Sequence, residues 1–128
     1  MKLIIDSSGW LEFFADGPNA NIFSIPLSDA SQLLVPVITM FEVFKVVMRQ
    51  RNEDDAFQAI ALMRQGTIIE LSEAIALEAA KLSLMYKTPM ADSIILATAH
   101  QYNAELWTQD VDFKNIPGVK YIPKGIIN

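Results

Sequence analysis

The sequence contains no cysteine, and only one of its 128 residues is a histidine. The chain can form no disulfide bond and offers no thiolate to a metal ion, so any metal site would have to use oxygen ligands. The absence of cysteine also fits a reducing compartment. Charged or amide residues interrupt every apolar stretch, and the opening residues 1–6 are too short for a signal peptide. We therefore expect a cytoplasmic protein with no membrane association.

Basic residues are also scarce. The chain has 10 Lys and Arg against 15 Asp and Glu, a net charge of −5. This balance argues against a protein that holds nucleic acid on a broad basic surface, since such binding grows with the number of phosphates neutralised. An acidic protein can still cut nucleic acid when a metal ion contacts the phosphate. With 52% hydrophobic residues, the length suits one compact core, and we expect a single domain over residues 1–128.

Short apolar runs alternate with segments of helical periodicity. Strands are predicted at residues 2–5, 33–35, 67–71, 105–108 and 119–122, and helices at 9–14, 20–28 (weak, interrupted by Pro26), 37–51, 54–65, 72–86 and 89–102. This alternation predicts an α/β domain with a mostly parallel sheet between helical layers. Ligands of such sheets bind beyond the carboxyl ends of the strands.

Four acidic residues occupy positions in this pattern that indicate a functional site. Asp6 follows the first predicted strand directly, and Asp110 lies two residues past the strand at 105–108. If those two strands are neighbours, both carboxylates enter one crevice. Glu42 interrupts an apolar stretch inside a helix, and Asp92 lies in the first turn of another.

Each acid also has a purely structural explanation. Asp92 would complement a helix N-terminus capped by Thr88. Thr39 and Glu42 have the spacing of a capping box. Loop side chains could cap the helices that follow them, namely Ser7 or Ser8 after the first strand and Asp110 or Asp112 after the fourth. Taken together, four acids at the ends of elements are harder to explain in this way.

Two other features of the sequence also have possible functional interpretations. Lys45 and Arg49 follow Glu42 at helical spacing and could contact a substrate phosphate; alternatively, Lys45 pairs with Glu42 or both cations are simply solvated. His100 could join a serine and an aspartate in a hydrolase triad. However, no G-x-S-x-G turn is present, and a lone histidine near a helix C-terminus commonly interacts with the helix dipole.

Several stretches resemble the PIN-domain ribonucleases, in particular the VapC toxins of toxin–antitoxin pairs. They are "LIIDSSGWLEFF", "VPVITMFEV", "ADSIILATAHQYNAELWTQDVDF" and "GVKYIP", which together span almost the whole chain. The resemblance implies a PIN-like α/β/α fold with a small parallel sheet in the order 3-2-1-4-5, which makes the first and fourth strands neighbours. The acids of PIN domains match Asp6, Glu42, Asp92 and Asp110.

The same resemblance assigns further roles. Ser7 and Thr108 match hydroxyl residues that accompany the first and fourth acids, and Asp112 is an auxiliary candidate ligand. Carboxylate ligands without cysteine or a histidine cluster favour Mg²⁺, with Mn²⁺ as a substitute. In a nuclease such a metal lowers the pKa of an attacking water. The expected activity is endonucleolytic hydrolysis of single-stranded or structured RNA that leaves a 5′-phosphate and a 3′-hydroxyl.

The VapC resemblance also implies partners: a small antitoxin that inhibits the enzyme, and a second copy in a homodimer. The aromatic cluster Trp10, Phe13 and Phe14 is core, or a partner surface where it is exposed. The alternatives are a catalytically inactive PIN-fold interaction protein and a housekeeping PIN nuclease without an antitoxin. A receiver-like phosphoacceptor domain ranks last, because it would need an acidic pair where this chain has Asp6, Ser7 and Ser8.

Overall fold

The computed structural model describes residues 1–125 and contains a five-stranded parallel sheet. Its strands are β1 (Leu3–Ile5), β2 (Leu33–Pro36), β3 (Thr67–Ile69), β4 (Glu105–Thr108) and β5 (Val119–Tyr121). The order is β3-β2-β1-β4-β5, so the predicted α/β fold and strand order are confirmed. Residues 126–128 lie outside the described residues, and a single domain over all of 1–128 stays a prediction.

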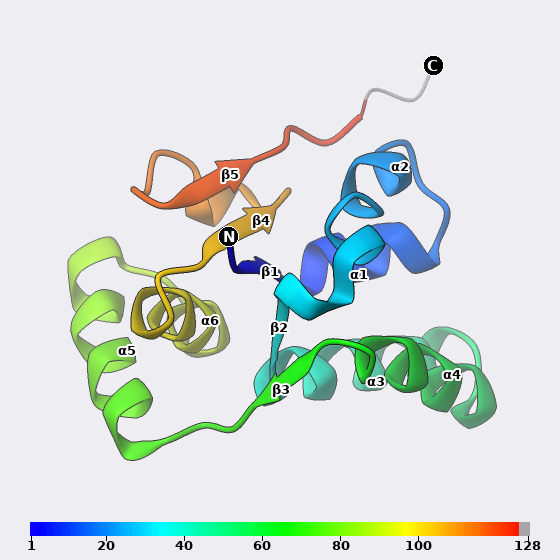
Figure 1. Ribbon diagram of the computed structural model, residues 1–128, viewed down its shortest axis with the longest axis horizontal. Helices are drawn as coiled ribbons and strands as arrows, with labels where there is room; N and C mark the ends of the chain where they lie inside the picture. Colours follow the sequence, from blue (N-terminus) through cyan, green and yellow to red (C-terminus); the bar gives the residue numbers. More distant parts are fainter. Residues whose placement is uncertain (126–128) are drawn as a thin grey trace.

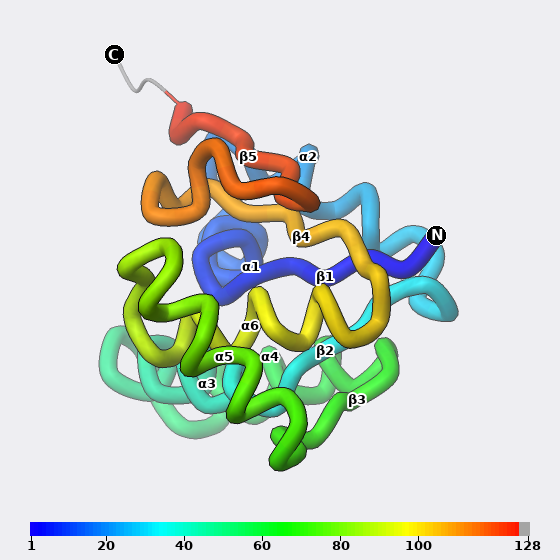
Figure 2. Tube along the Cα trace, turned by 90° about the vertical axis from the view of Figure 1, so that its left-hand side faces the viewer, coloured from blue at the N-terminus to red at the C-terminus, as the bar shows by residue number. Residues whose placement is uncertain are grey.

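Helices cover both faces of the sheet (Figure 1, Figure 2). They are α1 (Ser7–Phe14), α2 (Ala20–Phe23), α3 (Val37–Gln50), α4 (Glu53–Met63), α5 (Glu73–Tyr86) and α6 (Met90–Gln101), with two short 3-10 segments, η1 (Pro26–Gln32) and η2 (Val111–Phe113). The pair α5 and α6 lies on one face, and α1, α3 and α4 lie on the other. Of the helices described, none has the length and apolar character needed to cross a bilayer.

Alternation along the strands divides the core in two. Ile4 packs into a cluster with α5 and α6, while its neighbour Ile5 packs into a cluster with α1, α3 and α4. Successive side chains of a strand point to opposite faces, so one apolar run serves both layers. Gly9 lets α1 approach this sheet closely, because a Cβ there would lie 2.6 Å from Ile5 and 2.7 Å from the ring of Phe23.

Five of the six predicted helices agree with the structure to within two residues at each end, and the sixth, at 20–28, does not. Helix α1 begins at Ser7 instead of residue 9, because Asp6 caps it. The weak helix predicted over 20–28 is two separate segments, α2 and η1. Pro26 stands at the start of η1, where its missing N–H costs nothing and its fixed φ favours a new helical turn.

The aromatic cluster of α1 is mainly part of the core. Trp10 is fully buried and stacks on Phe14 with 5.7 Å between ring centroids, while Phe13 and Phe14 are half-buried. The suggestion that Trp10 belongs to a partner surface is therefore wrong, because its ring is already covered by the chain itself. Only the outer edges of Phe13 and Phe14 remain accessible.

Candidate functional site

Asp6 lies at the carboxyl end of β1, and the residue is only 2% exposed. One carboxylate oxygen accepts the backbone N–H of Gly9 at 2.9 Å, which caps α1. The same carboxylate accepts hydroxyl hydrogen bonds from Ser8, at 2.7 and 2.9 Å, and from Thr108, at 2.6 Å. Asp6 therefore caps α1 in place of the predicted caps Ser7 and Ser8, because it is the one residue between the end of β1 and the start of α1.

Strand pairing brings Asp6 to the end of β4. Ile5 is paired with Trp107, so the residues that follow the two strands leave the sheet side by side. Thr108 joins them: its hydroxyl donates to Asp6 and accepts the backbone N–H of Asp110 at 2.9 Å. The adjacency that the resemblance implied for the first and fourth strands is confirmed.

Glu42 enters the site from α3. Its carboxylate accepts the hydroxyl of Ser7 at 2.5 Å, which links α3 to the first turn of α1. The alternative capping box does not form, because α3 already begins at Val37 and the hydroxyl of Thr39 bonds to the carbonyl of Pro36. The carboxylate of Glu42 is therefore not used to cap its own helix.

Asp92 lies in the first turn of α6. The prediction that Thr88 caps α6 is wrong. The N-cap residue is Pro89, which makes no side-chain hydrogen bond. The hydroxyl of Thr88 instead lies 2.6 Å from that of Ser93. The negative charge of Asp92 still lies at a helix N-terminus, which is favourable.

Three carboxylates converge at the carboxyl edge of the sheet. Asp92, Asp110 and Asp112 each offer an oxygen, and these three oxygens lie within 4.8 Å of one another. Asp110 also caps η2, because it accepts the backbone N–H of Asp112 at 2.9 Å. Its structural role and its place in the cluster therefore coexist. The turn of η2 brings Asp112 to the cluster as well.

Burial and mutual repulsion raise the pKa of two of these acids. Burial raises the pKa of Asp6 to about 6, against hydrogen bonds from Thr108, Ser8 and Gly9 that lower it, and the charge of Asp110 adds to the rise. The pKa of Asp92 rises to about 7, first through burial and then through the charges of Asp110, Glu42, Asp6 and Asp112. Charges on five acids therefore act on one another in this site.

This donor set suits a hard divalent cation. Carboxylate oxygens are the ligands that Mg²⁺ and Mn²⁺ prefer, and a cation between them would offset the repulsion that raises the pKa of Asp92. Asp92, Asp110 and Asp112 have the spacing to share one ion. Which acids bind it, and whether Asp110 or Asp112 dominates, stays a prediction.

The raised pKa values predict a pH-dependent stability in chelator. Both carboxyls titrate in the folded protein above their usual value of 3.8, so the stability they contribute is present at low pH and is lost as pH rises from about 4 to about 7. For the buried Asp6 this amounts to on the order of 2–3 kcal/mol. We expect a lower melting temperature at pH 7.5 than at pH 5, measured by calorimetry in EDTA.

Asp92→Asn provides the control for this prediction, because it removes one of the two titrating groups. The fall in melting temperature between pH 5 and pH 7.5 should be smaller in this variant than in the wild type. An identical fall in both proteins would show that Asp92 does not titrate in this range.

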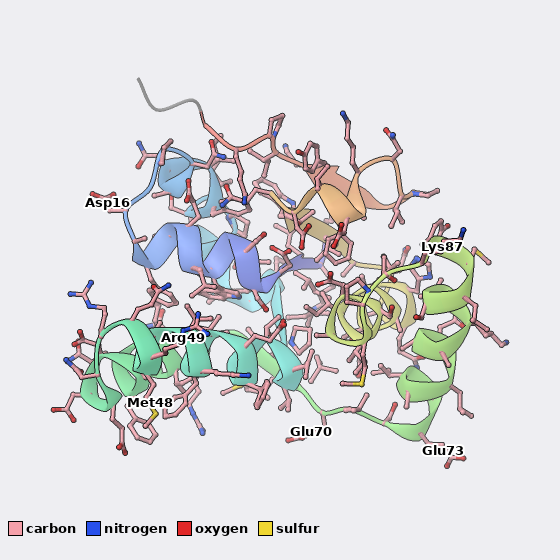
Figure 3. The ribbon with its side chains drawn as sticks, turned by 180° about the vertical axis from the view of Figure 1, so that it is seen from behind. Asp16, Met48, Arg49, Glu70, Glu73 and Lys87 are labelled. Atoms are coloured by element: carbon pink, nitrogen blue, oxygen red, sulfur yellow. The ribbon has the colours of Figure 1, made fainter. Side chains whose placement is uncertain are left out.

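The candidate phosphate contacts lie on the exposed side of α3. Lys45 lies over the ring of Phe41, 5.8 Å from its centroid, and Figure 3 shows Arg49 on the side of α3 nearer α1. Among residues 1–125, Arg51 pairs with Asp55, and a ring nitrogen of His100 lies 3.9 Å from the carboxylate of Glu78. Lys45 does not pair with Glu42 there, so that alternative is wrong. A phosphate contact stays a prediction.

Sequence reasoning missed the position of two residues. The sequence presents Ser8 as a candidate helix cap or as a serine of a hydrolase triad, yet its hydroxyl donates to Asp6 and accepts the backbone N–H of Gln109 at 3.3 Å. Gln109 is buried and accepts a hydrogen bond from Asn19 at 3.0 Å. The spacing of Asp6 and Gly9, typical of an Asp N-cap, was the available signal for where Ser8 would lie.

Comparison with known proteins places the chain in a family. A comparison with curated proteins finds no match. Among solved structures, a chain of a toxin–antitoxin complex from Klebsiella pneumoniae is 28% identical, with a TM-score of 0.76, over 94% of this chain and 100% of that one. A chain of VapBC2 from Rickettsia felis, bound to a DNA fragment from its promoter, is 16% identical, with a TM-score of 0.74, over 96% and 98% of the two chains.

VapC20 from Mycobacterium tuberculosis, described as a toxin that cleaves the sarcin–ricin loop, is 11% identical, with a TM-score of 0.75, over 91% and 95% of the two chains. At these lower identities the likeness is one of fold. The sequence profile of the PIN domain matches residues 3–119. Given this match, and a sheet in the order that the resemblance implied, the chain belongs to the PIN-domain family.

Proposed function

We propose that this protein is a metal-dependent endoribonuclease that acts as the toxin of a type II toxin–antitoxin pair. The observation that carries the proposal is the convergence of Asp92, Asp110 and Asp112 within 4.8 Å, beside the buried Asp6. Mutually repelling carboxylates at the ligand-binding edge of a parallel sheet are costly unless they serve a cation. PIN-domain proteins of this kind are nucleases.

In this proposal each part of the site has a role. Asp92 and Asp110, with Asp6 and Glu42, hold Mg²⁺ or Mn²⁺, and Asp112 assists them. When bound, the ion would lower the pKa of an attacking water and offset charge on the scissile phosphate. One of the carboxylates accepts the proton of that water. Lys45 and Arg49 contact the phosphates of a single-stranded or structured RNA.

The proposed partner is a small antitoxin. Similarity to chains of toxin–antitoxin complexes supports it, and so does a groove of about 820 Å³ between α1, α3 and α4. Apolar side chains such as Leu11, Phe14 and Leu62 line the groove, together with Ser8, whose hydroxyl bonds to Asp6, and Gln109, the residue before Asp110. An extended or helical segment lying there could continue into the site. We also propose a homodimer in the cytoplasm, for which the exposed apolar residues of α5 offer a surface.

Inhibition would follow from the charge of the site. An arginine of the antitoxin could bridge two carboxylates with paired hydrogen bonds, and would then exclude both the cation and the phosphate. Inhibition should therefore be competitive with metal. A partner that is partly disordered when free should bind with a large negative change in heat capacity.

Co-expression tests this proposal. The chain is expressed with the product of the reading frame immediately upstream, and the complex is purified and sized. Cleavage of single-stranded RNA in Mg²⁺ is measured before and after selective proteolysis of the partner. We expect no cleavage from the complex, and restored cleavage with 5′-phosphate and 3′-hydroxyl product ends after proteolysis.

Two other outcomes would decide against parts of the proposal. A monomer without a co-purifying partner, which cleaves RNA but arrests no growth on overexpression, would indicate a housekeeping PIN nuclease. A chain that binds the partner but cleaves no RNA under any metal condition would indicate a catalytically inactive interaction protein.

A further inference from the structure

Ser8 occupies a junction that its position in the sequence does not reveal. It is the second residue of α1 and is half-buried. Its hydroxyl donates to the carboxylate of Asp6, with oxygen distances of 2.7 and 2.9 Å, and accepts the backbone N–H of Gln109 at 3.3 Å. Ser8 therefore contacts both the end of β1 and the end of β4.

Thr108 makes a parallel connection on the other side of the same carboxylate. Its hydroxyl donates to Asp6 at 2.6 Å and accepts the backbone N–H of Asp110 at 2.9 Å. The two hydroxyl oxygens are 3.4 Å apart. Consecutive backbone N–H groups, those of Gln109 and Asp110, are thus each joined to Asp6 through one hydroxyl.

This arrangement couples the position of one acid to that of two others. The backbone held by the two hydroxyls includes Asp110, the N-cap of η2, and leads directly into η2, which brings Asp112 to the cluster. The neighbouring Ser7 does something different, since its hydroxyl donates to Glu42 on α3. The two serines therefore orient acids from different elements, and neither caps α1.

We propose that Ser8 is a positioning residue for the metal site, which orients the Asp6 carboxylate and fixes the loop after β4 relative to it. The inference rests on the proposed function, because it concerns the same acids. Residues that hold metal ligands by hydrogen bonds typically change metal affinity by about 10–100-fold when they are removed. Ser8 has the contacts of such a residue on both of its sides.

The test is the affinity of the full chain for Mn²⁺, measured by electron paramagnetic resonance in the absence of RNA. Ser8→Ala should raise the dissociation constant about 10-fold or more. The matched control is Ser83→Ala on α5, whose hydroxyl donates to the carbonyl of Thr88 at 3.0 Å and faces no acid of the site. This control should bind Mn²⁺ as the wild type does.

A second pair of variants separates the hydroxyl from the shape of the side chain. Ser8→Thr keeps the hydroxyl and should retain wild-type affinity for Mn²⁺ within about threefold. Ser8→Val has nearly the same shape as Ser8→Thr but no hydroxyl, and it should lose affinity as Ser8→Ala does. This pair keeps the test valid if the alanine variant does not fold. A Ser8→Val protein that melts as Ser8→Thr does in EDTA but binds Mn²⁺ more weakly would support a positioning role.

Failure of this inference differs from failure of the proposed function. If the wild type binds Mn²⁺ and cleaves RNA, but Ser8→Ala and Ser8→Val bind Mn²⁺ with wild-type affinity, Ser8 has only a structural role and the inference is overturned. If the wild type neither binds Mn²⁺ nor cleaves RNA, the proposed function is refuted, and this inference is refuted as well because it rests on that function.

Discussion

Asp92→Asn is expected to reduce RNA cleavage in Mg²⁺ by more than about 100-fold, since even partners of metal ligands contribute roughly 10–100-fold. Asp92 belongs to the three-carboxylate cluster and lies in the field of four other acids. The amide keeps the size of the side chain but binds a cation poorly. At pH 7.5 without metal, the variant should be at least as stable as the wild type, because like-charge repulsion is relieved.

The same loss of cleavage is expected for Asp6→Asn, Glu42→Gln and Asp110→Asn. Asp112→Asn should be milder if Asp112 only assists, and equal severity would make it a main ligand. A matched control is Asp54→Asn, which changes an exposed acid in the first turn of α4, as Asp92 is in the first turn of α6. This control should cleave as the wild type does. Near wild-type activity in three of the four site variants would refute a shared site.

Removal of metal should have an effect of similar size. We expect cleavage to fall to background in excess EDTA and to return when Mg²⁺ or Mn²⁺ is restored. Carboxylates repel a phosphate, so a site in which Asp92, Asp110 and Asp112 converge needs a cation to bring the scissile phosphate to them. The measurement is the initial rate on a fluorescent single-stranded RNA, with metal added back in a titration.

Ca²⁺ should distinguish metal binding from catalysis. It prefers the same oxygen ligands but takes more of them in a looser geometry, so it should bind and raise the melting temperature without restoring cleavage. Asp92→Asn should show a smaller rise in melting temperature with each cation than the wild type. Full activity in excess chelator would contradict the metal mechanism directly.

The order of the sheet could be expected before the structure, although periodicity alone did not supply it. The alternation of apolar runs and helical segments predicts parallel strands between helices, since strands buried on both faces are apolar throughout. It does not say which strands are neighbours. The resemblance to PIN domains implied that β1 and β4 are neighbours, and the pairing of Ile5 with Trp107 confirms this.

Local capping was less well predicted than the placement of elements. Ser7, Ser8 and Thr88 all have side chains that favour helix N-caps, yet none of them caps a helix here. The hydroxyl of Ser7 instead bonds to Glu42 on α3, whereas those of Ser8 and Thr88 bond to Asp6 and Ser93 nearby in the sequence. Preferences for caps are worth about 1 kcal/mol, so another hydrogen bond of similar strength, local or tertiary, can override them.

The sequence by itself determined the chemistry available to this protein. Without cysteine, and with a single histidine, a metal site has to be built from oxygen ligands, and the positions of Asp6, Asp92 and Asp110 at the ends of elements, and of Glu42 within an apolar helical stretch, are visible in the printed residues. Element type also follows from the sequence, because it depends on the spacing of apolar residues a few positions apart.

Only the tertiary structure decided how these acids meet. Carboxylate oxygens of Asp92 and Asp110 lie within 4.8 Å of each other because α6 and the loop after β4 both begin at the carboxyl edge of the sheet, and η2 adds Asp112 to them. The raised pKa of Asp92 and the bonds of Ser8 arise from the same convergence. Such contacts join residues from separate elements, so their geometry depends on packing that no local spacing specifies.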